Sequence, residues 1–197
     1  MFFVAVGFSD EKIARLFDLA RIVLQPEFAR PAHITLRGPY KNRKDVAATV
    51  MGKDVGSITV TRPGSFLSDM QNTIYLGVTI LGISDFWRKP DFPEGIPHLS
   101  IYDGEDRRFA WAVFNVLRKH KWGIRLNSTP MHILETKNRL ETEYLMRYES
   151  LASTMQLVTG NVYSAEEIKG MSRLDRIILL NQICLKIHSL THPSSTH

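Results

Sequence analysis

The chain has 197 residues, of which 44% are hydrophobic and 23% are charged, the balance of a soluble globular protein. This length allows one domain, or one domain with an appendage, and no run of about 18 apolar residues predicts a membrane span. The whole chain carries a net charge of +5, and its first 140 residues carry +6, because residues 141–197 carry five Lys/Arg against six Asp/Glu. Such an excess suits an anionic partner such as a nucleotide or RNA, and it suits an ordinary basic surface equally well.

The first fifty residues predict two strands and two helices. Residues 2–8 are rich in β-formers and predict a core strand; the run is too short for a signal peptide and lacks a basic start. Ser9 is placed as the N-cap of an amphipathic helix over residues 10–24. A short strand is expected over His33–Arg37, ending at Gly38-Pro39, with a short helix over about 43–51.

The middle of the chain predicts four further strands and one helix. Strands are expected over Gly56–Thr61 and Thr73–Ile80, with turns at Pro63-Gly64 and Asp69–Asn72. A proline-rich loop over 82–97 leads into a strand at His98–Tyr102. Asp103 is placed as the cap of a helix over about 105–121, and residues 124–136 predict one more strand.

From about residue 138 the pattern becomes helical. Leu140, Tyr144, Tyr148 and Leu151 form one apolar stripe. Ser164 to Glu167 has capping-box spacing ahead of an apolar-rich helical segment that extends to about residue 189, and residues 191–197 predict a frayed tail. The sequence therefore predicts an α+β fold with a helical C-terminal portion.

A weak internal repeat carries most of the functional information. Its first copy is Pro31-Ala32-His33-Ile34-Thr35-Leu36-Arg37-Gly38-Pro39, and its second is Ile96-Pro97-His98-Leu99-Ser100-Ile101-Tyr102-Asp103-Gly104. Because side chains alternate along a strand, we expect His33, Thr35 and Arg37 on one face. By the same rule His98, Ser100 and Tyr102 share a face. Each strand would then present an imidazole beside a hydroxyl and bury its aliphatic residues.

These groups suit the cleavage of phosphate esters. An unperturbed imidazole titrates near pH 6.5, so one can act as a base while the other acts as an acid. Each positioned proton transfer contributes roughly 10²–10⁴-fold to a rate. Thr35 and Ser100 can donate hydrogen bonds to the non-bridging oxygens, where charge accumulates. This chemistry needs no metal or other cofactor, and the hydroxyl partners argue against a zinc site built from histidines.

The motifs His33-Ile34-Thr35 and His98-Leu99-Ser100 resemble the paired H-x-T/S signatures of the two-histidine (2H) phosphoesterase superfamily. That superfamily includes the 2′-5′ RNA ligase-like and RNA cyclic phosphodiesterase proteins. The resemblance covers residues 1–137 and implies a bilobal catalytic domain with two pseudo-symmetric antiparallel sheets around a central cleft. It also implies that His33 and His98 are catalytic and that Thr35 and Ser100 bind phosphate. Ser100 stands where Thr is the commoner residue.

Residues 138–197 match nothing that this resemblance covers. We expect them to form a helical extension packed on the catalytic domain. Their role as a cap, a dimer surface or a partner-binding surface is open, and so is the oligomeric state.

The expected activity is hydrolysis of a phosphodiester in a nucleotide or RNA end, either a 2′,3′-cyclic phosphate or a 2′-5′ linkage. Which histidine is the acid stays open. One alternative is an RNA-end or nucleotide-binding module with little turnover, and another is a protein-interaction component carried by the C-terminal helices. The single cysteine, Cys184, favours a reducing cytoplasm.

Three further residues are candidates for substrate contacts. Arg37 suits either a phosphate or a surface salt bridge. Tyr40 and Tyr102 suit either stacking on a base or packing at the cleft wall. His132 lacks a hydroxyl residue two positions on, so we expect it to be structural.

Overall fold

The computed structural model describes residues 1–26, 31–50, 55–83, 96–135 and 151–192. The strands of these residues form one antiparallel sheet of seven, in the order β6-β3-β4-β5-β2-β1-β7. They are β1 (Phe2–Val6), β2 (Ile34–Tyr40), β3 (Ile58–Leu67), β4 (Asn72–Ile80), β5 (His98–Gly104), β6 (Ile124–Leu126) and β7 (His132–Glu135). The helices are α1 (Glu11–Leu24), α2 (Arg43–Val50), α3 (Arg107–Leu117), α5 (Ala165–Gly170) and α6 (Arg173–Thr191), and residues 151–159 are also helical. This arrangement confirms the predicted α+β class.

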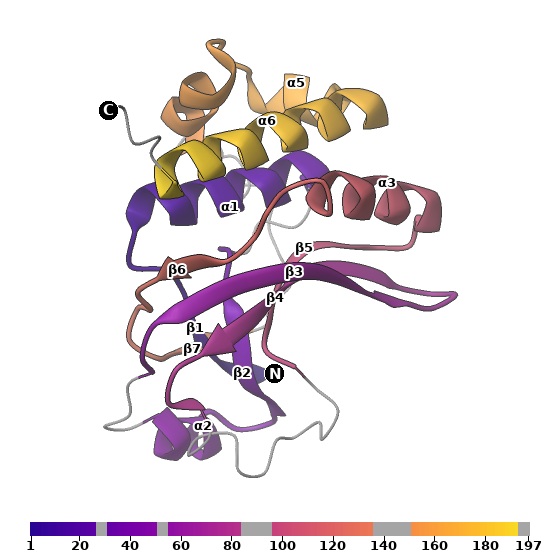
Figure 1. Cartoon of the computed structure of the whole chain (residues 1–197). Helices are drawn as coiled ribbons and strands as arrows, with labels where there is room; N and C mark the ends of the chain where they lie inside the picture. Colours follow the sequence, from indigo (N-terminus) through magenta and orange to yellow (C-terminus); the bar gives the residue numbers. More distant parts are fainter. Residues whose placement is uncertain (27–30, 51–54, 84–95, 136–150, 193–197) are drawn as a thin grey trace, which may run out of the picture.

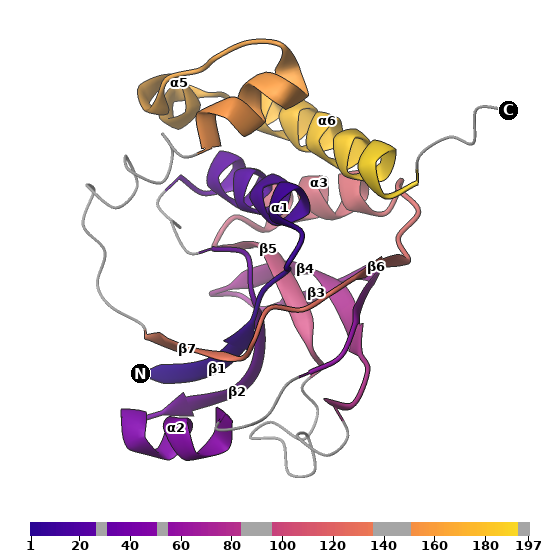
Figure 2. The same cartoon turned by 90° about the vertical axis from the view of Figure 1, so that its left-hand side faces the viewer.

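The sheet is strongly curled, and its connectivity explains why. β6 and β7 lie at opposite edges, although only residues 127–131 separate them in the chain. Seven strands laid flat would put the edges about 29 Å apart at about 4.8 Å per strand. The connection spans at most about 20 Å even when extended. The sheet must therefore bend toward a half-barrel, as Figures 1 and 2 show.

A layer of helices covers one face of the sheet (Figure 1). α3 packs on β3, β4 and β5, α1 packs on β5, and α6 lies against both α1 and α3 on the side away from the sheet. α2 contacts β1, β2 and β7 and lies at the end of the molecule remote from this layer (Figures 1 and 2). No helix of the described residues is long and apolar enough to cross a membrane.

The C-terminal helices share the main hydrophobic core. Residues 151–192 contribute nine buried residues to the same cluster as β1, β2 and α1: Leu151, Met155, Ala165, Ile168, Leu179, Leu180, Ile183, Cys184 and Ile187. The predicted boundary between residues 137 and 138 falls outside the described residues, as does most of the predicted apolar stripe from Leu140. The predicted loop over 82–97 and the predicted tail over 191–197 also lie mostly outside them.

Both N-caps predicted in the first 121 residues are wrong. Asp10 caps α1, and its Oδ1 accepts a hydrogen bond from the backbone N–H of Ile13 at 3.1 Å. Asp106 caps α3 in the same way, at 2.9 Å from Phe109 N. A cap must stand directly before the first helical residue, and an acidic side chain meets this need at both sites. Asp103 instead accepts hydrogen bonds from Gln71 and Thr73 at the open end of β4 and β5.

Two other predictions are corrected by the sheet. Residues 124–136 form two strands, β6 and β7, where one was expected. Pro63-Gly64 does not make a turn but lies inside β3, just beyond a bulge opposite Gly77. The other predicted turn, at Asp69–Asn72, is confirmed within one residue: the chain turns at Ser68–Gln71, where Ser68 N donates to Gln71 O at 3.0 Å. β3 and β4 therefore form a longer hairpin than predicted.

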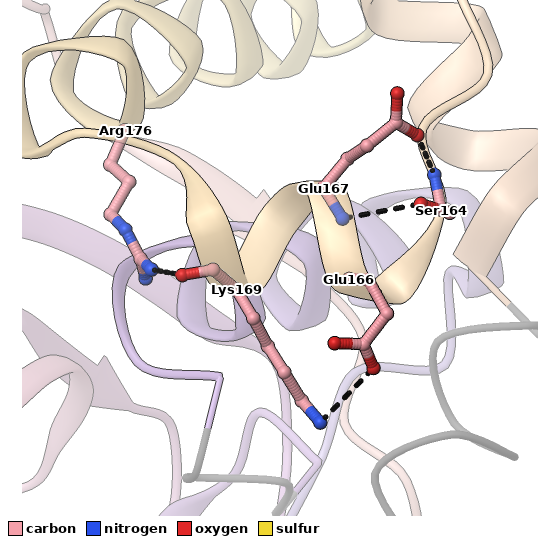
Figure 3. A network of polar contacts seen from close by, with 5 residues as sticks. All are labelled: Ser164, Glu166, Glu167, Lys169 and Arg176. Carbon is pink, nitrogen blue, oxygen red and sulfur yellow. Dashed lines mark hydrogen bonds and ion pairs between the residues drawn. The ribbon is translucent and has the colours of Figure 1, made fainter.

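The capping box at Ser164 is confirmed, but the helix that follows is short. Ser164 N donates to Glu167, Glu167 N donates to Ser164, and α5 ends at Gly170 (Figure 3). Ser172 then caps α6 as a separate helix. Arg176 ties this junction together, since its guanidinium donates to the carbonyls of Lys169 and Val23 at 2.9 and 2.8 Å. The predicted single helix is thus two helices anchored to the end of α1.

Candidate active site

The two repeat strands lie side by side in the sheet. β2 and β5 pair antiparallel through one bridge, Ile34 to Leu99, and both residues are fully buried in the core. Continuing this register by one residue in each direction sets Thr35 opposite His98 and His33 opposite Ser100. The two histidines then lie on one diagonal, about 7–8 Å apart at the backbone. The four residues predicted to form the site are thus the immediate neighbours of this one bridge.

The site face is the face opposite to the core. Ile34 and Leu99 point into the core, so their neighbours along each strand point the other way. His33, Thr35, His98 and Ser100 are all half-buried. A ligand at this face could therefore reach all four side chains.

The two imidazoles are held in the same way. Nδ1 of His33 lies 2.7 Å from the carbonyl oxygen of Pro31, and Nδ1 of His98 lies 2.8 Å from that of Ile96. A carbonyl can only accept, so Nδ1 carries the proton of the neutral ring and Nε2 keeps the basic lone pair. The repeat thus extends from the sequence to the tautomer and orientation of each ring.

Both repeat strands also bulge at the third residue after the histidine. Ala5 pairs with Thr35 but Val4 pairs with Arg37, so Leu36 is the extra residue in β2. In β5, Tyr75 pairs with Ser100 but Ile74 pairs with Tyr102, and Ile101 is extra. A bulge adds one residue and breaks the alternation of faces. In β5 the alternation of faces ends at Ile101, because Ile101 and Tyr102 are both buried, whereas the burial of β2 still alternates through Leu36 and Arg37.

The bulge removes Tyr102 from the predicted site. Its side chain is 5% exposed and its ring packs edge-on against Phe109 of α3, at 5.4 Å between centroids. The prediction that Tyr102 shares a face with His98 and Ser100 is therefore wrong, because Ile101 shifts it to the helix-covered face. Of the two uses predicted for Tyr102, packing is the one that its burial favours.

Arg37 and Tyr40 lie beyond the bulge in β2. Arg37 pairs with Val4 and is half-buried like Thr35, with the buried Leu36 between them, so its role in substrate contact stays a prediction. Tyr40 pairs with Phe2 at the end of the strand and packs against the hydrophobic core. Of the two uses predicted for Tyr40, packing is the one that its position favours.

Two aromatic residues of the β3–β4 hairpin flank His98, and sequence reasoning missed them. The Tyr75 ring lies 4.9 Å from the imidazole, and Phe66 stacks on Tyr75 at 4.6 Å and meets His98 edge-on at 5.4 Å. Burial raises the pKa of Tyr75, so its hydroxyl stays protonated at neutral pH. The sequence shows both aromatic residues in the predicted hairpin region, but it does not show which residues of the hairpin pair with β5.

Gly77 leaves room on the other side of His98. It pairs with His98 across β4 and β5, and a Cβ at this position would lie 2.7 Å from the hydroxyl of Thr61. The Thr61 side chain therefore lies over Gly77. It adds a third hydroxyl to this part of the sheet, from a residue that the sequence did not single out.

The other histidines of the described residues stand apart from this pair. His132 is exposed on the edge strand β7, with its Nδ1 3.4 Å from the Pro130 carbonyl. His120, His188 and His192 cluster around Trp122, beside the ends of α3 and α6. Within the described ranges, no three His, Cys, Asp or Glu residues are arranged to hold a metal ion.

Comparisons with known proteins add no assignment to this geometry. No protein-family model, no curated protein and no solved structure matches the chain.

Proposed function

We propose that this chain is a two-histidine phosphodiesterase of the 2H type, acting on a nucleotide or an RNA end. The observation that supports this most directly is the antiparallel bridge between Ile34 and Leu99, because it joins the two repeat strands at the residue between the histidine and the hydroxyl residue of each copy. The equivalent carbonyl contacts of the two rings add to it. The proposal includes the two-lobed description of the fold, with β7-β1-β2 and β5-β4-β3-β6 as the halves that meet at the site.

The reaction follows from two equivalent imidazoles on either side of a phosphate. Nε2 of one neutral ring takes a proton from the attacking water as its oxygen bonds to phosphorus. The other ring, protonated, gives its Nε2 proton to the ribose oxygen as that oxygen leaves. Thr35 and Ser100 donate hydrogen bonds to the non-bridging oxygens as their charge grows. The diagonal of about 7–8 Å between the histidines leaves room for a phosphate contacted from both ends.

The partner and the setting belong to the same proposal. The basic excess of the first 140 residues favours an anionic substrate, and the substrate is a 2′,3′-cyclic phosphate or a 2′-5′ linkage. The reaction is placed in the cytoplasm, because the one cysteine is a buried free thiol. Burial raises the pKa of Cys184 to about 12, so this thiol has no part in the chemistry.

The deciding experiment is a product-resolved screen in the presence of a chelator. The substrates are a 2′,3′-cyclic nucleotide, a 2′-5′-linked dinucleotide, a cyclic phosphate of ADP-ribose and a cyclic dinucleotide. We expect turnover of at least one, unaffected by the chelator, with a bell-shaped pH profile. His33→Ala and His98→Ala should each reduce kcat/KM by roughly 10²–10⁴-fold.

His132→Ala is the matched control, because this ring also approaches the carbonyl two residues earlier but lies two strands from Thr35. We expect it to keep wild-type activity. Full activity in both His33→Ala and His98→Ala would contradict the mechanism. Tight, salt-dependent binding without product from any of the four substrates would instead favour the binding-module alternative.

A further inference from the structure

Helix α6 is apolar on two opposite sides. Its inner side buries Leu179, Leu180, Ile183, Cys184 and Ile187 against α1 and α3. A helix on a protein surface normally keeps its outer side polar. The outer side of α6 instead carries Leu174, Ile178 and Leu185, which are 69%, 50% and 55% exposed. These three residues are called the outer stripe below.

The outer stripe is narrow and straight. At about 100° per residue, Leu174, Ile178 and Leu185 lie within about 40° of one another around the helix axis. They extend over about 16 Å along it, at about 1.5 Å per residue. Scattered exposed leucines need no explanation, but an aligned row opposite the buried face indicates a helix-packing surface.

The stripe is complementary to itself in an antiparallel pair of helices. Pairing two copies of α6 around a twofold axis near residue 180 sets Leu174 of one copy against Leu185 of the other. In such a pair, residues on the same flank of the two helices meet, so Asp175 lies beside Lys186 of the second copy. Within one chain these two charges are about 16 Å apart and cannot pair. The same contact recurs on the other side of the axis, as a twofold interface requires.

A hollow beside the stripe fits this arrangement. It has a volume of ≈ 370 Å³, lies between α5 and α6, and is lined by Tyr163, Glu167, Met171, Asp175, Ile178, Leu179 and Gln182. Two of these residues are acidic. The second copy would place its Leu185 over the apolar part of the hollow and its Lys186 beside Glu167 and Asp175.

We propose that the chain forms a homodimer through antiparallel pairing of the outer stripes of α6. The dimer is independent of the proposed activity, since the histidine pair lies on the opposite face of the sheet from the helical layer. A small interface of this kind corresponds to a dissociation constant in the range of about 10⁻⁶ M.

The test is the oligomeric state of the full chain, measured by sedimentation equilibrium. We expect the mass to approach twice 22.5 kDa as the concentration rises to about 10⁻⁴ M. The double variant Ile178→Gln/Leu185→Gln should weaken the dimer by at least about 100-fold. Leu190→Gln is the matched control, because it changes a 40% exposed leucine of the same helix that lies about 140° from Leu185 around the axis, and it should leave the dimer intact.

Charge reversal gives a second test of the dimer, and this test does not depend on the apolar contacts. Lys186→Glu should weaken the dimer, because it faces Asp175 and Glu167 of the second copy. Adding Asp175→Lys to the same chain should restore it at least in part. A wild-type chain that stays monomeric, a dimer that survives the double glutamine variant, or a charge pair without rescue would each overturn the proposal.

Discussion

The hydroxyl residues of the candidate site lie beside the one bridge that joins the repeat strands. Thr35 follows Ile34 and Ser100 follows Leu99, and an antiparallel register continued by one residue would set each hydroxyl residue opposite the histidine of the other repeat copy. Neither residue is needed to hold the sheet, because both are half-buried and lie on the face away from the core. Their role can therefore be separated from folding by removing the hydroxyl alone.

We expect Thr35→Val and Ser100→Ala each to lower kcat by roughly 10²–10³-fold on any substrate that the protein turns over, as the loss of one charge-stabilising donor does. The unfolding temperature should stay close to wild type. Thr35→Ser keeps the donor and should retain most of the activity. Steady-state kinetics with a cyclic nucleotide measures all three.

Thr79→Val serves as the control for these variants, because Thr79 is an exposed strand residue near the far end of β4. It should be kinetically silent. If it lowers kcat as much as Thr35→Val does, the hydroxyl of Thr35 has no special part in the reaction.

At the scale of the elements, the sequence predicted the repeat strands well over three residues each. The alternation of His33 and Thr35, and of His98 and Ser100, follows from the geometry of any strand. The bulges at Leu36 and Ile101 do not, because a bulge depends on the partner strand and not on the residue itself. Tyr102 was misplaced for this reason, and the partners of His98 in the hairpin could not be identified.

The helices show a similar division between local and tertiary causes. The apolar spacing predicted α1 within a residue at each end, because the buried residues of a helix recur in the sequence with the helical period. It did not predict that α6 starts as a separate helix at Ser172, after α5 ends at Gly170. Nor did it predict that Asp10, and not the adjacent Ser9, caps α1. Those choices depend on a residue or two and on contacts such as that of Arg176 with Val23.

The end of α6 carries a histidine cluster that should make stability depend on pH. The ring of His188 stacks on His120 at 5.3 Å and lies 5.8 Å from His192. Burial, and then the neighbouring charges of His120 and His192, hold the pKa of His188 below its ordinary value. In the unfolded chain His188 binds a proton near pH 6.5, whereas in the folded chain it binds that proton only at a lower pH.

The free energy of unfolding should therefore fall as the pH drops below about 6.5, and level off once the folded histidine also titrates. His188→Phe keeps an aromatic ring in the cluster and should flatten this part of the profile. Denaturant titrations between about pH 7.5 and 5 measure the effect. His132→Phe, on the exposed edge strand, should follow the wild-type profile; equal slopes in all three proteins would contradict the assignment to His188.

At the scale of the whole molecule, the candidate site lies at the weakest joint of the sheet. β2 and β5 share a single bridge, whereas β3 and β4 or β4 and β5 pair over most of their length. The two halves of the sheet are therefore held together mainly by what packs over the joint. α1 and α3 both pack on β5, the strand on one side of the joint, and α6 contacts both helices. The C-terminal helices thus support the geometry of a site from which they are distant in sequence.

This support predicts that residues 1–150 do not fold without the C-terminal helices. Burying one large aliphatic side chain contributes about 1.5–3 kcal/mol, so the four buried Leu and Ile residues of α6 contribute on the order of 10 kcal/mol. That is comparable to the whole stability of a typical domain, about 5–15 kcal/mol. A chain ending at residue 150 should be insoluble or should lack cooperative unfolding. Ile183→Asp should lower the free energy of unfolding by more than about 3 kcal/mol, whereas Gln182→Asp at the exposed neighbour should change it by less than about 1. A shortened chain that unfolds cooperatively and keeps the activity of the full chain would show instead that the two halves of the sheet need no cover.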